Sequence, residues 1–405
     1  MISVKLKNRK RFIYAIFLIH LFMAVFLLLL PQNAARARAE DGEFPVSAQE
    51  QLNQSISDLL NELDLQALQE YVNSLSSISE DNVKERLLEY IRGAKFDYEN
   101  FGTQILDLLF KNIADILPAF ACIAAIALLS GAINTLQAGT TARTSTEMTF
   151  LIAYAAALIP LIAVLVECFQ KTMASMEEMQ IQMQIIYPIM LTLMATSGGA
   201  LTASICRPAV AFFSTTIVSV LSQIVLPITV TVIAFSMASN LSKELKINKF
   251  TAFFKSINKW IIGICISVFG LFFTLQGITA ATYDGVARRA AKYAIGNGIP
   301  IVGGFLSGGF DLAIAGSILI KNSLGSMSIF LMLSVLFEPI VLLLSVTLFL
   351  RFTAAVTQPF GDSRISDFLG ETADNLHYCT AGLLLTAFLY FLSIMLLVSA
   401  SEVLF

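Results

Sequence analysis

The sequence predicts an all-α membrane protein: a polytopic helix bundle of six to eight mature spans, preceded by a small helical extracytoplasmic region. Of the 405 residues, 56% are hydrophobic and 14% are charged, which is unlike the balance in soluble globular proteins. Several apolar runs are longer than about 18 residues, the length at which a helix can cross a bilayer. These two observations exclude a soluble globular protein and predict membrane lipid as the surroundings.

Residues 1–39 have the pattern of a secretory signal peptide. A basic start precedes the apolar run Phe12–Leu30. Ala37 and Ala39 then fit the small-x-small rule for cleavage after residue 39. An uncleaved anchor is the alternative, because the apolar run is long enough for one. In both cases residue 40 onward is expected outside the cytoplasm.

Residues 40–112 form an acidic segment that we expect to be helical. They carry 15 acidic and 5 basic side chains. Leucine and isoleucine recur at helical spacing in 52–75 and 83–109, which indicates amphipathic helices. The simpler interpretation is a small helical cap above the membrane. A docking surface for another extracytoplasmic protein is the alternative.

Residues 113–405 form the predicted membrane domain. Its long apolar runs are the predicted spans 113–136, 148–169, 208–239, 261–281, 327–352 and 376–400. Between two of them, Asn240–Trp260 puts lysines on one face and phenylalanines on the other, which is typical of an interfacial helix. Trp260 suits the membrane boundary. A second amphipathic helix is predicted after Thr357.

Two further apolar segments, Tyr187–Arg207 and Ile299–Ile320, are interrupted by glycine, and each runs from a proline to Ser-Gly-Gly. Glycine allows helices to approach closely in a bilayer, and paired glycine-interrupted segments are typical of the working centre of transporters. The residues expected to pack helices or act as hinges are Gly198, Gly199, Gly303, Gly304, Gly308, Gly309, Pro227 and Pro339.

The order of these parts repeats, which suggests duplicated units over 148–258 and 259–376. The distance from Ser-Gly-Gly to the next interrupting proline is 30 residues in one unit and 32 in the other. Chance similarity among apolar helices is the alternative.

The number of spans depends on the two Ser-Gly-Gly segments. If both cross the bilayer, there are eight mature spans, and the lysine-rich 240–259 lies outside, against the positive-inside rule. If both are re-entrant, there are six spans, and 240–259 lies in the cytoplasm. Length favours eight spans and charge favours six. Both versions leave the C-terminus outside.

The sequence has no motif for catalysis, nucleotide binding or metal binding. HExxH, CxxC and Walker motifs are absent, and the five cysteines lie in or beside apolar runs without metal-ligand spacing. We therefore predict no enzyme activity and no cofactor. The remaining candidates are ionisable residues within apolar runs: Asp311, Glu338, Arg207 and Arg351. Asp311 and Glu338 could form a polar path or gate, or a charge pair that holds helices together.

Two stretches resemble the stage III sporulation protein AE family of endospore-forming Firmicutes. They are Gly270–Gly325, which contains TAATYDGVARRAAKYAIGNG, and Thr357–Leu369, TQPFGDSRISDFL. The resemblance covers nearly the whole chain. It implies a multi-pass protein of the mother-cell membrane around the forespore, with its N-terminal region outside the cytoplasm. It also implies as partners other stage III sporulation proteins: an ATPase, small membrane subunits, ring-forming subunits and a forespore-membrane partner.

The function that this resemblance implies is that of a membrane subunit in the channel complex between mother cell and forespore. Such a subunit is needed for forespore development and would line or scaffold a transport conduit in a secretion-like apparatus. The alternative is a self-contained secondary transporter built from two repeats. Nucleic acid is not an expected partner, because membrane spans flank the lysine cluster on both sides.

Overall fold

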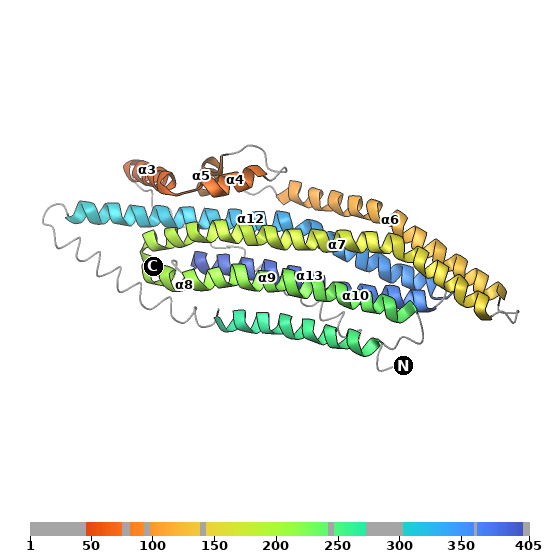
Figure 1. Ribbon diagram of the computed structural model, residues 1–405. Helices are drawn as coiled ribbons and strands as arrows, with labels where there is room; N and C mark the ends of the chain where they lie inside the picture. Colours follow the sequence, from red (N-terminus) through yellow and green to blue (C-terminus); the bar gives the residue numbers. More distant parts are fainter. Residues whose placement is uncertain are drawn as a thin grey trace. The chain divides into compact units, whose positions relative to one another are not determined.

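The computed structural model describes residues 46–74, 82–92, 98–137, 143–241, 247–272, 303–359 and 363–399, and every regular element in these ranges is a helix (Figure 1). The predicted signal peptide, with Ala37 and Ala39, lies outside the described residues. Residues 1–51 form a unit separate from residues 52–405, and the packing below is that of the second unit.

Six helices within the described ranges are long and apolar enough to cross a membrane, which confirms the polytopic all-α fold. The stretches that meet this criterion are Asp107–Ile133, Glu147–Ser197, Thr202–Leu241, Asn248–Phe272, Leu312–Thr357 and Ser363–Ser399.

The helices are longer than the predicted spans, because polar stretches taken as connections continue them. Examples are α6 (Tyr98–Gln137), α7 (Arg143–Met194), α12 (Gly303–Thr357) and α13 (Ser363–Ser399). In α12 the predicted span 327–352 and residues 303–320 of the glycine-rich segment before it are one helix. Polar residues end a membrane span but not a helix, since a helix satisfies its own backbone hydrogen bonds in water and in lipid.

The first Ser-Gly-Gly segment is the turn between two antiparallel helices. Helix α7 ends at Met194, a π-helical turn η1 (Ala195–Gly199) follows, and α8 (Ala200–Phe212) begins the return. Gly199 has φ −94° and ψ 36°, which leaves the helical region. The Tyr154 hydroxyl of α7 donates to the Met237 carbonyl at 2.9 Å. Both residues are far from the turn in sequence, so the helices before and after it lie side by side. The segment is therefore a helical turn, and the number of mature spans, six or eight, stays a prediction.

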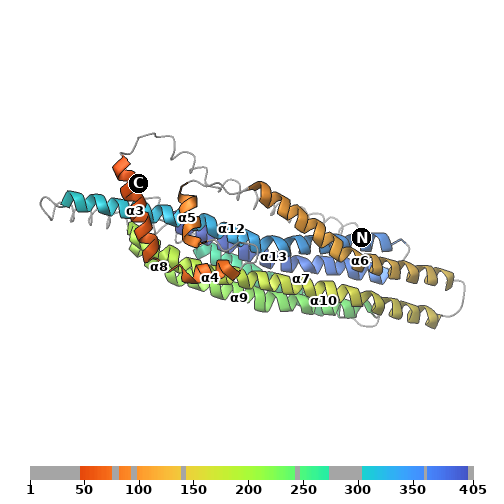
Figure 2. The same cartoon turned by 90° about the horizontal axis from the view of Figure 1, so that it is seen from above.

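The second Ser-Gly-Gly segment has a different local structure. Gly303, Gly304, Gly308 and Gly309 all lie within α12, which continues through them without a turn. Both segments nevertheless stand at the start of helices that run in the same direction (Figures 1 and 2). The internal repeat itself stays a prediction.

The return leg contains two π-helical turns, and a proline follows the second of them. After α8 come η2 (Phe213–Ile217), α9 (Val218–Val220), η3 (Leu221–Val225) and α10 (Leu226–Leu241). Pro227 is the second residue of α10, directly after η3. A proline has no N–H for the usual helical bond, and a π-helical turn before it lets the helix continue with shifted pairing. Pro339 lies within α12, which also continues past it.

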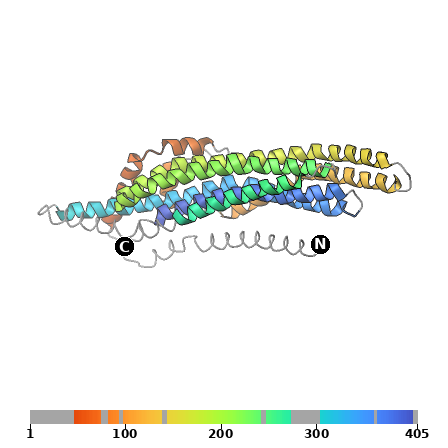
Figure 3. The same cartoon turned by 60° about the horizontal axis from the view of Figure 1, so that its bottom comes forward.

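Helices α7, α12 and α13 pack together at the centre of the bundle, where small residues allow close contact (Figure 2). A methyl group added at Gly325 of α12 would lie 2.6 Å from the Val398 Cγ2 atom of α13. One added at Gly382 of α13 would lie 3.0 Å from the Met176 Cε atom of α7. The helix Asn248–Phe272 lies beside the return leg, where the Asn258 amide donates to Thr229 Oγ1 at 2.9 Å (Figure 3).

Three short amphipathic helices, α3 (Val46–Glu62), α4 (Gln66–Ser74) and α5 (Val83–Ile91), confirm the predicted helical N-terminal region. Asn82 caps α5 by accepting from the Lys84 amide. The α4 residue Tyr71 accepts a 2.8 Å hydrogen bond from Gln182 of α7. These helices therefore pack against the sides of the long helices.

Candidate functional site

The predicted polar path does not form a single site. Asp311 and Glu338 lie in the same uninterrupted helix, α12. Their 27-residue separation corresponds to about 40 Å along the axis, so the two carboxylates cannot contact each other. The side chain of Asp311 lies outside what the structure describes. Arg207 is an exposed residue of α8.

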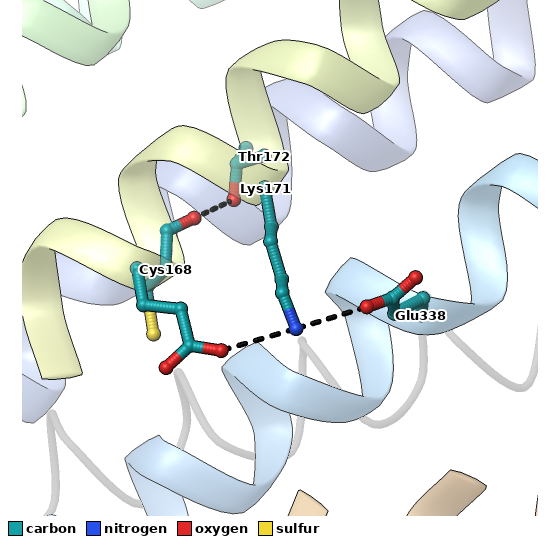
Figure 4. Close-up of polar contacts among 5 residues, drawn as sticks. Cys168, Lys171, Thr172 and Glu338 are labelled. Atoms are coloured by element: carbon teal, nitrogen blue, oxygen red, sulfur yellow. Dashed lines mark hydrogen bonds and ion pairs between the residues drawn. The ribbon is translucent and has the colours of Figure 1, made fainter.

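Glu338 instead forms an ion pair with a residue that the sequence did not single out. The Lys171 amine of α7 lies 2.9 Å from Glu338 Oε1 and 3.0 Å from Glu167 Oε1 (Figure 4). The exposed fractions of the side chains are 34% for Lys171, 49% for Glu167 and 50% for Glu338. The group carries two negative charges and one positive charge and connects α7 to α12. Glu338 thus takes part in a charge pair between helices, but its partner is Lys171 and not Asp311.

A second group of charges follows one face of α13. Asp367, Glu371, Asp374 and His377 are all exposed and recur every three or four residues, so they lie on a single stripe of the helix. We call these four residues the α13 polar stripe. The stripe belongs to a helix long and apolar enough to cross a membrane. Ionisable side chains at such positions are unfavourable against lipid and usually face protein or water.

Neighbouring helices supply partners for most of the stripe. Arg351 of α12 lies 3.1 Å from Asp374 Oδ1 and 2.9 Å from His377 Nε2. Glu371 accepts hydrogen bonds from Ser236 and from Asn240, the latter at 3.3 Å. Arg351 was one of the ionisable residues that the sequence singled out within apolar runs, and its partners are Asp374 and His377.

Arg364 connects the beginning of α13 with the beginning of α7. Its guanidinium lies 3.1 Å from Glu147 Oε2 and 3.3 Å from the centroid of the Phe150 ring. An ion pair and a cation–π contact from one guanidinium fix the relative position of two helix starts. Asp367 of the stripe lies three residues beyond Arg364 in α13, so it is at the same end of this helix.

These groups can form a hydrated surface with acidic character, because the stripe has three carboxylates. Within the described ranges, no three His, Cys, Asp or Glu side chains are grouped as metal ligands. The free cysteines in those ranges are Cys122, Cys168, Cys206, Cys265 and Cys379. The charged residues described above therefore interact through ion pairs and hydrogen bonds.

Sequence reasoning missed the stripe because the region after Thr357 was interpreted as a loop and an amphipathic helix. The spacing of the four residues was a usable signal, since it places them on one helical face. The i, i+4 spacing of Glu167 and Lys171 was also a usable signal. The pairing of Lys171 with Glu338, 167 residues further along the chain, had no such signal.

Comparisons with known proteins were consistent with each other. Residues 82–401 match the Stage III sporulation protein AE family. Stage III sporulation protein AE of Bacillus subtilis (strain 168) is 26% identical over 217 residues, which cover 54% of this chain and 54% of the relative, about half its length. The comparison with solved structures gave no match. Since the family match covers most of the sequence, the chain belongs to the Stage III sporulation protein AE family.

Proposed function

We propose that this chain is a membrane subunit of a channel complex between the mother cell and the forespore, and that its α13 polar stripe borders an aqueous conduit. Family membership supports the sporulation role. The observation that carries the conduit is the row of four exposed ionisable residues on a membrane-spanning helix. Such residues mark ion or solute paths more often than lipid-facing surfaces.

The partners that we propose are other stage III sporulation proteins: an ATPase, small membrane subunits, ring-forming subunits and a protein of the forespore membrane. The proposed location is the mother-cell membrane around the forespore, with α3, α4 and α5 outside the cytoplasm. The role is conducting or structural, because the charged groups described above are paired with one another and do not form a catalytic arrangement.

Cysteine accessibility in the assembled complex tests the conduit. Asp367→Cys should react with a hydrophilic, membrane-impermeant maleimide in membranes from sporulating cells. Leu348→Cys on α12 is the matched control, because Leu348 is 67% exposed but apolar and close in height to the stripe. It should stay unlabelled. Equal labelling at both positions, or none at Asp367→Cys, would contradict a water-lined stripe.

Purification from sporulating cells separates the proposal from a self-contained transporter. A channel subunit should co-purify with other stage III proteins, and a transporter should bind solute when purified alone. Recovery of the protein without any of those partners, together with solute binding, would favour the transporter.

A further inference from the structure

The long helices exceed the thickness of a bilayer. Helix α7 has 52 residues and α12 has 55, which correspond to about 78 Å and 82 Å. A bilayer with its headgroups is about 40–45 Å thick. Even a tilt of about 40°, the upper end of the usual range, leaves about 60 Å of each helix along the membrane normal. A substantial part of both helices must therefore lie outside the lipid.

The exposed face of α7 changes character at one point. Over Met148–Val166, 19 residues or about 28 Å, the exposed side chains are all apolar. They are Met148, Leu151, Ile152, Ala155, Ile159, Ile162, Ala163 and Val166. Over Glu167–Gln184 most exposed side chains are charged or polar: Glu167, Gln170, Glu177, Glu178 and Gln184, with Met173, Ala174 and Ile181 among them. The apolar stretch has the thickness of one hydrocarbon layer.

Two neighbouring helices show the same change. Helix α6 exposes Asp107, Lys111 and Asp115, and beyond them only apolar side chains as far as its exposure is described: Leu117, Pro118, Ala121, Cys122, Ala125, Leu129 and Ala132. Helix α12 exposes Glu338, and then Leu344, Leu348, Phe352, Ala355 and Val356. The exception is Arg351, whose partly exposed side chain pairs with Asp374 of α13. Helices α6 and α12 run in the direction opposite to α7 (Figure 1).

The three changes lie at nearly the same height. The Lys171–Glu338 ion pair places the charged side chains of α7 and α12 side by side. The Phe120 ring of α6 stacks on the Phe349 ring of α12, with centroids 5.5 Å apart. Asp115 lies five residues before Phe120, and Glu338 lies eleven before Phe349. The last acidic residues on the two helices therefore differ by about 9 Å in height, so one plane can separate polar from apolar surface.

Trp260 lies at this plane. Its helix contacts the return leg where the Asn258 amide donates to the Val225 carbonyl at 3.4 Å. Val225 precedes Met237 by twelve residues, and Val166 follows Tyr154 by twelve, so the Tyr154–Met237 hydrogen bond makes Val225 level with Val166. Trp260 is 72% exposed, and tryptophan prefers the membrane–water interface.

The short helices pack on the polar side of the plane. Tyr71 of α4 contacts Gln182, eleven residues beyond Lys171 along α7. The α3 residues Ile56 and Leu59 lie 3.4 Å and 3.1 Å from a methyl group placed at Gly316, 22 residues before Glu338. All three short helices expose glutamates on their outer faces, and such faces suit water better than hydrocarbon.

We propose that the hydrocarbon of the bilayer surrounds the bundle only at the height of Met148–Val166, and that the part beyond the Glu167–Lys171–Glu338 group projects into water. The projecting part then includes the α7–α8 turn and carries α3, α4 and α5 on its side. Helix Asn248–Phe272 does not follow this pattern, because it exposes Lys249 and Lys259 before Trp260 and apolar Ile264 and Leu271 beyond it. Helix α8, in the projecting part, also exposes apolar Ile205 and Phe212. The boundary is thus fixed by α6, α7 and α12.

Thiol labelling of the full chain in nanodiscs tests the boundary, because both membrane faces are then accessible. In a Cys122→Ala background, which keeps the four buried cysteines, Glu177→Cys and Gln184→Cys should react with an impermeant maleimide. Ile152→Cys and Ile159→Cys should not react until detergent denatures the protein, although a lipophilic maleimide should label them in the bilayer. Equal labelling of the four variants, or the reverse pattern, would overturn the placement.

The single tryptophan gives an independent readout. Fluorescence of Trp260 should be quenched more by lipids brominated near the headgroup than by lipids brominated near the chain end. Stronger quenching by the deep label would show that Trp260 is not at the boundary. Neither readout depends on whether α13 borders a conduit, so the two proposals can fail separately.

Discussion

Lys321 shows how single residues adapt to the interior of this bundle. Its side chain is fully buried in α12, and its amine donates to the Val398 carbonyl at 2.7 Å. Val398 lies in the last turn of α13, where unpaired carbonyls and the helix dipole favour a cation. Because the buried amine donates to a carbonyl at the end of a helix, it avoids the large cost of an unpaired buried charge.

One turn further along α12, Gly325 gives a prediction at the residue scale. Gly325→Ala should lower the free energy of unfolding by about 1–2 kcal/mol, because overpacking against Val398 exceeds the gain in helix propensity. Gly263→Ala is the matched control, since no atom lies within 4 Å of its added methyl group. It should be neutral or stabilising by up to about 1 kcal/mol. Thermal unfolding in detergent compares them, and similar melting temperatures would contradict the close α12–α13 contact.

At the scale of elements, α4 is joined to the long helices by one buried amide. The Gln182 amide nitrogen donates to the Tyr71 hydroxyl at 2.8 Å and to the Leu331 carbonyl at 3.1 Å. Three segments, α4, α7 and α12, therefore meet at this side chain. Burial raises the pKa of Tyr71 above the usual tyrosine value of 10.0, and nearby Glu178 raises it further, although the hydrogen bond from Gln182 opposes this.

Tyr71→Phe should cost about 1 kcal/mol of stability near neutral pH, because Gln182 loses one of its two acceptors. Since the folded-state pKa of Tyr71 is raised, its contribution is complete below pH 10 and is lost as the pH rises through the folded-state value. The stability difference between wild type and variant should therefore shrink above pH 10. Chemical denaturation at a series of pH values measures it, and a constant difference would mean that Tyr71 does not titrate in this way.

The elements also show which parts of the sequence reasoning were sufficient. Long apolar runs identified membrane-capable helices, because the transfer free energy of a segment depends only on its own residues. The ends of those helices were misplaced. The polar stretch Glu167–Gln184 continues α7, whereas the apolar Ser-Gly-Gly segment after it is a turn. Hydropathy reports the preferred solvent of a segment and not the path of its backbone.

At the scale of the whole molecule, the alternating directions of the long helices bear on the number of spans. The described helices alternate in direction from α6 to α13, and the start of helix Asn248–Phe272 lies at the same end as the start of α7 (Figures 1 and 3). Basic residues gather near this end, among them Arg143, Lys249 and Arg364. The positive-inside rule assigns such an end to the cytoplasm.

A cysteine at position 249 tests this orientation. Lys249→Cys should react with an impermeant maleimide only after the cells are permeabilised. Glu177→Cys is the control for the opposite end and should react in intact protoplasts. Reaction of Lys249→Cys in intact protoplasts would support the version with eight spans and would reverse the orientation proposed for α3, α4 and α5.

The sequence by itself determined the fold class, the acidic helical N-terminal region and the family, because composition, helical periodicity and family-specific stretches are local properties of the chain. Only the tertiary structure decided that Glu338 is paired with Lys171, that Asp311 is about 40 Å away along α12, and that α13 carries a polar stripe with partners on other helices. The Lys171–Glu338 and Ser236–Glu371 contacts depend on the register between segments more than a hundred residues apart. That register is set by side-chain packing, which hydropathy and spacing do not encode.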